Sequence, residues 1–298
     1  MSKCFYHSAD LDGKCSGAIV KMCDPFVQMI GVDYGEPFPW GLIKPDERIY
    51  MVDFTIEPVE EMLRLAEQCD LIWIDHHKSP IMAGIDFGHV KGVRQIGEAA
   101  CELAWEWFRQ QWKVGPMPLV VRLLGRYDVW DLSARPNILE FQYGMRCRQC
   151  DPEKNRSFWR QLFGNDPELV WAIISDGKAI LKYVEQRERE YAKKSVFEVD
   201  FEGCQFIACN RQFSGSKLFD SVYDPMRHDG MMVFGWQGKY WKVGLYTDKP
   251  GFDMSELAKL YGGGGHKAAA GFTCDHLPFE LKGRKNAQRA LQAIQTSA

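Results

Sequence analysis

LIWIDHHK, residues 71–78, places four apolar residues directly before a carboxylate and two imidazoles. An apolar run of this kind is typical of a buried strand. Asp75, His76 and His77 are then crowded at the end of that strand, where water cannot reach all of them. Buried polar groups are costly unless something binds them, so a divalent metal ion is the natural ligand here. The alternative is an aspartate that accepts hydrogen bonds from its neighbours, beside an exposed histidine.

Three further segments carry acidic or imidazole side chains where an apolar segment ends. His7 follows the apolar residues 4–6 and is itself followed by Asp10 and Asp12, and Asp53 follows residues 49–52. Asp128 follows residues 120–127, although that segment has a helical pattern. Strands that alternate with helices predict an α/β fold with a parallel sheet, whose ligands bind beyond the carboxyl ends of the strands. The four ends are therefore expected to converge on one crevice. Mixed oxygen and imidazole ligands without a thiolate suit Mn²⁺ or Mg²⁺ rather than structural zinc.

The same segments resemble, in order, the four motifs of the DHH phosphoesterases, a family of metal-dependent hydrolases. The matching stretches are residues 7–13, 52–53, 75–77 and 127–128, and residues 261–272, YGGGGHKAAAGF, resemble the signature of the DHHA1 domain. The short spacing from His7 to Asp10 is similar to that of the nanoRNase B-like oligoribonucleases. The resemblance implies a parallel-sheet DHH domain with flanking helices and a smaller α+β DHHA1 domain. The active site would lie in the cleft between them.

Three parts of the chain are predicted from this resemblance and from local patterns. Residues 1–165 would form the DHH catalytic domain, residues 166–194 a connecting helix that Asp166 caps, and residues 195–298 the DHHA1 substrate-binding domain. The last part is rich in strand patterns, and Gln237-Gly238 is a candidate two-residue hairpin turn. Residues 279–295 are predicted to form the final helix.

The resemblance also implies a site with two metal ions. One ion would be held by His7, Asp10 and Asp53, and the other by Asp12, Asp53, His76 and Asp128, with Asp53 as the bridge. Asp131 competes with Asp128 for the last carboxylate, and Asp128 is preferred because it directly follows a Gly-Arg-Tyr turn. Two ions of this kind activate a water molecule and neutralise charge on a phosphate.

Two catalytic residues and a substrate-binding loop complete the predicted site. Asp75 would orient His76, while His77 would contact the scissile phosphate or assist proton movement. Four glycines before a histidine indicate a tight backbone, whose N–H groups can form an anion nest, and a helix beginning at residues 267–270 would add its positive end. A flexible glycine linker is the alternative. The predicted substrate contacts are Gly263, Gly264, Gly265, His266, Arg211 and Ser216.

Charge and composition limit the class of protein. The chain has 298 residues and a formal net charge of −3, which is not the charge of a protein that coats long nucleic acid. Eight basic against five acidic residues between Arg122 and Arg160 suit a short polyanion, with a solvated surface as the alternative. No apolar segment has the length of a signal peptide or a membrane span, so a cytoplasmic protein without membrane contact is expected. The ten cysteines, Cys147 and Cys150 among them, are expected to be free thiols.

The predicted function is hydrolysis of short oligoribonucleotides to 5′-mononucleotides, an activity like that of a 3′–5′ exoribonuclease. Two divalent metal ions would serve as cofactors, with Mn²⁺ preferred and Mg²⁺ as the alternative. The alternative substrates are a cyclic or linear dinucleotide and a 3′,5′-bisphosphate nucleotide, and a non-catalytic nucleotide-binding module is the rival class. The expected partners are short RNA oligomers or dinucleotides, and a homodimer is left open.

Overall fold

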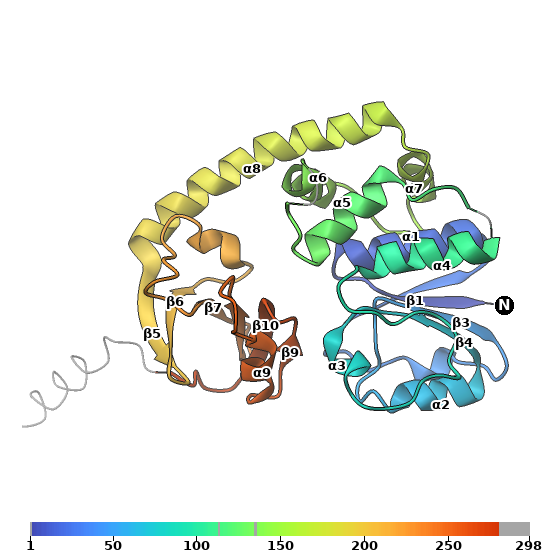
Figure 1. The fold of residues 1–298 in the computed structure, drawn as a ribbon, viewed down its shortest axis with the longest axis horizontal. Coiled ribbons are helices and arrows are strands. Elements are labelled where there is room, and N and C mark those ends of the chain that lie inside the picture. Colours follow the sequence, from blue (N-terminus) through green and yellow to red (C-terminus); the bar gives the residue numbers. More distant parts are fainter. Residues whose placement is uncertain (1, 113, 134–135, 280–298) are drawn as a thin grey trace, which may run out of the picture. The chain divides into compact units, whose positions relative to one another are not determined.

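Two units, each with its own sheet, make up the computed structural model (Figure 1). They comprise Met1–Lys182 and Tyr183–Ala298. The structure describes residues 2–112, 114–133 and 136–279. Most of the predicted final helix, 279–295, therefore lies outside the described residues.

The sheet of the first unit is wholly parallel, as the sequence predicted. Its strands are β1 (Lys3–His7), β2 (Gln28–Val32), β3 (Arg48–Val52) and β4 (Asp70–Ile74). They lie in the order β2-β1-β3-β4, so all four carboxyl ends meet at one edge. The α/β fold class is confirmed.

Both faces of β1, β3 and β4 are largely buried, which explains why these strands read as nearly continuous apolar runs, whereas the edge strand β2 is more exposed. Figure 1 shows α1 (Leu11–Cys23) and α4 (Ala100–Trp112) on one face and α2 (Glu61–Gln68) on the other. Successive residues of a strand point to opposite faces. In β4, Ile74 joins the core beneath α1 and α4, whereas Trp73 joins the core on the α2 side.

Five further helices belong to the first unit or lead out of it. They are α3 (Lys78–Ile81), α5 (Leu119–Asp128), α6 (Ile138–Arg146), α7 (Arg156–Phe163) and α8 (Pro167–Ser195), and a 3-10 turn, η1, spans Trp40–Leu42. Asp128 is therefore the last residue of a helix, as the helical pattern of its segment indicated. The Asp166 side chain accepts hydrogen bonds from the Glu168 and Leu169 amides at 3.1 and 3.2 Å, as expected of the cap of α8.

The second unit is built on a mixed sheet in the order β5-β6-β7-β8-β10-β9. Its elements are β5 (Val196–Phe201), β6 (Cys204–Asn210), η2 (Ser216–Phe219), β7 (Gly230–Trp236), β8 (Trp241–Tyr246), α9 (Met254–Lys259), β9 (Gly264–Gly265) and β10 (Ala269–Cys274). Two local predictions were wrong. The β7–β8 connection has four residues, closed by a 2.8 Å bond from the Gln237 amide to the Tyr240 carbonyl. Ala269 and Ala270 lie in a strand rather than in a helix.

No helix among residues 2–112, 114–133 and 136–279 is both long and apolar enough to cross a bilayer.

A buried ion pair offers a test of the first unit's stability. The Lys3 ammonium lies 2.5 Å from both carboxylate oxygens of Glu47, and both side chains are buried. Glu47→Gln is expected to lower the free energy of unfolding, measured in urea, by about 3 kcal/mol, because it leaves the Lys3 charge buried without its partner.

The matched control is Glu61→Gln, which breaks the exposed pair between Glu61 and Arg64. It is expected to change the free energy by less than about 1 kcal/mol. Equal losses in the two variants would contradict the assignment of Lys3 and Glu47 as a buried pair.

Candidate metal centre

His7, the last residue of β1, is the centre of a first cluster. Its Nδ1 lies 2.9 Å from Asp10 Oδ2 and 3.5 Å from Asp53 Oδ2. Asp10 is also the N-cap of α1, since its other oxygen accepts a 2.9 Å bond from the Gly13 amide. A Cβ at Gly13 would stand 2.1 Å from the His7 carbonyl oxygen, so only glycine allows the helix to start this close to the strand.

His76, just after β4, is the centre of a second cluster. Its Nε2 lies 3.3 Å from Asp53 Oδ1, 3.3 Å from Asp128 Oδ2 and 3.6 Å from Asp12 Oδ2. The Asp12 carboxylate also accepts hydrogen bonds from the Ala100 and Cys101 amides at 2.9 and 2.8 Å. These amides belong to the first turn of α4, whose dipole favours a negative charge at that point.

Asp53 belongs to both clusters. One of its oxygens faces His7 and the other faces His76. The backbone of Asp53 has a φ of 55°, a left-handed conformation that costs energy in a residue with a Cβ. Immediately after β3, this conformation directs the carboxylate towards both imidazoles. The predicted bridging residue is therefore the one that stands between the two groups.

Asp75 is fully buried, and its carboxylate contacts the side chain of a different histidine from the one expected. Its Oδ1 lies 2.7 Å from His77 Nδ1 and accepts a 2.8 Å bond from the His76 amide, while its Oδ2 accepts a 2.5 Å bond from the Thr55 hydroxyl. The imidazole that Asp75 holds is thus that of His77, whereas His76 was expected.

The clusters carry more negative charge than their imidazoles balance. Burial lowers the pKa of His7 and of His76, but the adjacent carboxylates outweigh this and raise both values to about 11. Burial raises the pKa of Asp128 to about 7. Burial also raises the pKa of Asp12, and the charges of Asp53 and Asp128 raise it further. A group of like charges in a site of low dielectric attracts a cation.

Three atoms supply the test of whether a metal ion fits. His7 Nδ1, Asp53 Oδ1 and Asp128 Oδ2 are buried, and none forms a hydrogen bond of acceptable geometry with the part of the chain that the structure describes. Ligand atoms of His7, Asp10 and Asp53 lie within 4.8 Å of one another, and so do those of Asp12, His76 and Asp128. The donor set of carboxylates and imidazoles fits Mn²⁺ or Mg²⁺. The clusters are therefore able to hold divalent cations.

Comparisons by sequence find no relative, since no protein-family model and no curated protein matches this chain. Solved structures do match. The first is the DHH domain of a member of a family of ribosomal proteins, with a TM-score of 0.58 and 15% identity over 98% of this chain and 85% of that one. The chain has the DHH fold. The resemblance seen in the sequence is thus confirmed at the level of the fold.

Two further structures match this DHH-fold protein over nearly the full length of both chains. The pGpG-specific phosphodiesterase PggH from Vibrio cholerae has a TM-score of 0.53 and 12% identity over 100% of this chain and 98% of its own. An exopolyphosphatase-related protein from Bacteroides fragilis has a TM-score of 0.53 and 15% identity over 99% of this chain and 91% of its own.

Three residues that contact the two clusters or Asp75 were not predicted from the sequence. Asp33 Oδ1 lies 3.2 Å from His7 Nε2, and Asp33 directly follows β2, so the rule that singled out Asp53 could have found it. Thr55 holds Asp75, and the Tyr34 ring lies 5.5 Å from His7 and 5.7 Å from His77. No motif marks Thr55 or Tyr34, because each acts through a contact distant in sequence.

The predicted substrate contacts of the second unit have structural partners of their own. The Gly263 amide donates a 3.0 Å bond to Ala258, and Gly264 and Gly265 pair with β10. The Arg211 guanidinium is held by Glu188 at 2.5 and 3.0 Å and lies over the Tyr191 ring.

The expectation of bare glycine amides was thus wrong at Gly263, whose N–H group closes the end of α9. Ser216 begins η2, and His266 occupies the turn between β9 and β10, where its amide donates a 2.8 Å bond to Ala269. Substrate binding by these residues stays a prediction.

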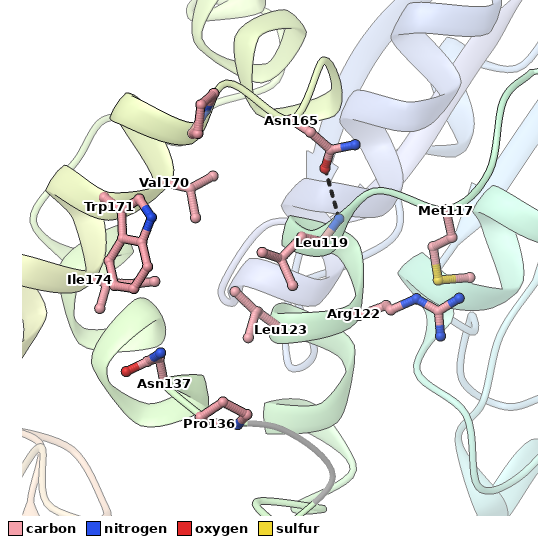
Figure 2. Close-up of a pocket in the computed structure, with 11 residues that line it drawn as sticks. Met117, Leu119, Arg122, Leu123, Pro136, Asn137, Asn165, Val170, Trp171 and Ile174 are labelled. Carbon is pink, nitrogen blue, oxygen red and sulfur yellow. Dashed lines mark hydrogen bonds between the residues drawn. The ribbon is translucent and has the colours of Figure 1, made fainter.

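Figure 2 shows a pocket of the first unit that is separate from the clusters. It has a volume of 490 Å³ and is lined largely by apolar side chains, including Leu123, Val170 and Trp171. Among its described lining residues, Arg122 is the one charged side chain. The pocket therefore has no donor set for a metal ion.

Metal binding should release protons from this DHH-fold protein. Both cluster imidazoles are protonated at neutral pH, and a cation that binds their nitrogens must displace those protons. The affinity for Mn²⁺ is therefore expected to rise with pH, about tenfold per pH unit for each proton released. Calorimetric titration in two buffers of different ionisation enthalpy should detect the release of at least one proton.

The matched control is His89→Gln, which removes an exposed histidine outside the clusters and should leave the proton release unchanged. Asp53→Asn should abolish binding, since both clusters lose their shared carboxylate. An affinity for Mn²⁺ that does not change with pH would contradict the role of the two imidazoles.

Proposed function

We propose that this protein is a divalent-metal-dependent phosphodiesterase that hydrolyses short oligoribonucleotides to 5′-mononucleotides. The observation that carries the proposal is the position of Asp53 between two clusters, each with an imidazole and further carboxylates. Two such clusters around a shared carboxylate suit a pair of ions, Mn²⁺ preferred and Mg²⁺ as the alternative. Such a pair supplies an activated water molecule and neutralises charge on the phosphate.

The residues of the two clusters would act as metal ligands. His7, Asp10 and Asp53 would hold one ion, and Asp12, Asp53, His76 and Asp128 the other. Helix α4 fixes Asp12 through two backbone amides, so this ligand is already in place before a metal binds. Preorganised ligands and charges lower the cost of reaching the transition state.

His77 would act on the phosphate itself. Its Nδ1 is fixed by Asp75, which is in turn held by Thr55. Burial lowers the pKa of His77, but the Asp75 charge outweighs this and raises it to about 9. We propose that the protonated ring donates a hydrogen bond from Nε2 to a phosphate oxygen.

A defined set of substrates tests the reaction. With Mn²⁺, the full-length protein is expected to convert di- to pentaribonucleotides to 5′-mononucleotides, as followed by chromatography. A cyclic dinucleotide, the linear dinucleotide pGpG and adenosine 3′,5′-bisphosphate complete the panel. No mononucleotide release from any oligomer, beside an active control enzyme, would overturn the proposal.

The linear dinucleotide pGpG is the second candidate substrate. PggH is pGpG-specific, and its structure resembles this chain over nearly its whole length. Hydrolysis of pGpG alone, without trimers to pentamers, would favour this narrower activity. Binding of nucleotides without any turnover would favour a non-catalytic module.

Asp128 and Asp131 form a matched pair for a second test. Asp128 Oδ2 lies 3.3 Å from His76, whereas Asp131 accepts a hydrogen bond from Ser133 at 3.1 Å and lies 3.7 Å from Arg126. Asp128→Asn is expected to lower kcat by at least about 10²-fold, because a charged ligand is lost from a preorganised site. Asp131→Asn should retain activity to within about twofold, a change worth less than about 0.5 kcal/mol. The reverse pattern would assign the fourth carboxylate to Asp131.

A further inference from the structure

A second cavity borders the metal clusters within the first unit. Its volume is 730 Å³, within the range of about 300–1,000 Å³ typical of small-molecule sites. Asp10, the N-cap of α1, and Lys14, in its first turn, line one side of it, while Gln142 and Arg146 line it from α6. Gln142 and Arg146 are four residues apart in α6, so their side chains lie on the same side of that helix. Because Asp10 also belongs to the His7 cluster, a ligand in the cavity would be adjacent to the metal centre.

The Gln142 side chain brings to this cavity an amide oxygen that has no hydrogen-bond partner in the part of the chain that the structure describes. The side chain is 5% exposed, and its Oε1 is buried. A buried amide oxygen without a partner is costly and unusual in a folded protein. Rotation of the amide exchanges its oxygen and nitrogen, so it can either accept or donate a hydrogen bond. The base edge of a nucleotide offers both kinds of partner.

Two cations of the cavity lack a carboxylate partner. Within residues 2–112, 114–133 and 136–279, no carboxylate forms an ion pair with Lys14 or Arg146. The Arg146 guanidinium donates a 2.9 Å bond to the Tyr127 hydroxyl and lies 5.2 Å from the centre of the Tyr143 ring. It is thus held in place without being neutralised. By contrast, Arg148 is paired with Asp176 at 2.6 Å.

We propose that this cavity binds the nucleotide next to the scissile phosphate, an inference that rests on the proposed phosphodiesterase function. Lys14 and Arg146 would hold a phosphate of that nucleotide, since unpaired cations bind phosphate through charge-assisted hydrogen bonds. The Gln142 amide would form hydrogen bonds with the edge of the base. The shared wall at Asp10 places this nucleotide beside the ions, so that its linkage to the next residue enters the metal centre.

Cys147 provides a reporter that does not depend on turnover. It is an exposed free thiol on the cavity wall, whereas Cys150 is buried and its pKa is raised to about 11 by burial. The full-length protein with Mn²⁺ would be alkylated by N-ethylmaleimide, and each cysteine followed by mass spectrometry. 5′-GMP is expected to slow alkylation of Cys147 at least about fivefold, because a bound ligand excludes the reagent. Cys204, on β6 of the second unit, is the internal control.

Variants assign the contacts. Lys14→Met and Arg146→Met should each raise the GMP concentration needed for half-protection about tenfold, as should Gln142→Met. Arg122→Met, an exposed arginine of the other pocket, should leave it unchanged. Arg146 is exposed, so its variant keeps the test decisive if Gln142→Met fails to fold.

The outcomes separate this inference from the proposed function. Oligomer hydrolysis without GMP protection of Cys147, or protection that survives both Lys14→Met and Arg146→Met, would overturn the nucleotide site and leave the phosphodiesterase standing. Protection without hydrolysis would support the site while the phosphodiesterase failed. Equal protection by ribose 5-phosphate and GMP would overturn the base contact of Gln142.

Discussion

Three buried or half-buried carboxylates around one imidazole nitrogen are the constraint on which the first unit depends. Asp12, Asp53 and Asp128 all approach His76 Nε2 within 3.6 Å. Their mutual repulsion is strong away from water. The fold compensates part of it by placing the first turn of α4 against Asp12 and a protonated imidazole between the others. The remainder of the negative charge makes a cation the natural stabiliser of this edge, so binding and folding are coupled here.

The sequence predicted this edge well because its signals are local. A strand buried on both faces is apolar at most positions, and each such run ends where the chain can again carry charge, at His7, Asp53 and Asp75. A parallel sheet then brings these ends together without further information. Asp128 ends a helix, to which no such rule applies, and its assignment to the same metal ion as His76 followed from the family resemblance.

The errors have a different physical origin. Which imidazole Asp75 holds depends on rotamers and on Thr55, which is distant in the sequence. The glycine block was expected to present bare amides, yet the Gly263 amide completes the end of α9 and the next two glycines pair with β10. Glycine there allows close packing of the backbone, since a Cβ at Gly263 would stand 2.1 Å from the Gly271 carbonyl oxygen.

The distribution of unpaired cations bears on the length of the ligand. The basic stretch from Arg122 to Arg160 suggested an electrostatic surface, but Arg126, Arg148 and Arg156 are paired with Glu102, Asp176 and Glu153. A protein that binds a long polyanion needs a continuous series of free cations, because each neutralised phosphate adds to the affinity. Arg122, Lys154 and Arg160 of this stretch also form no ion pair with the described residues, but they do not line the cavity beside Asp10, where Lys14 and Arg146 lie together. Two cations at one cavity can contact one or two phosphates. Further nucleotides of a longer substrate would form no additional ion pairs at this cavity. The nucleotide site proposed above therefore favours a ligand of very few nucleotides.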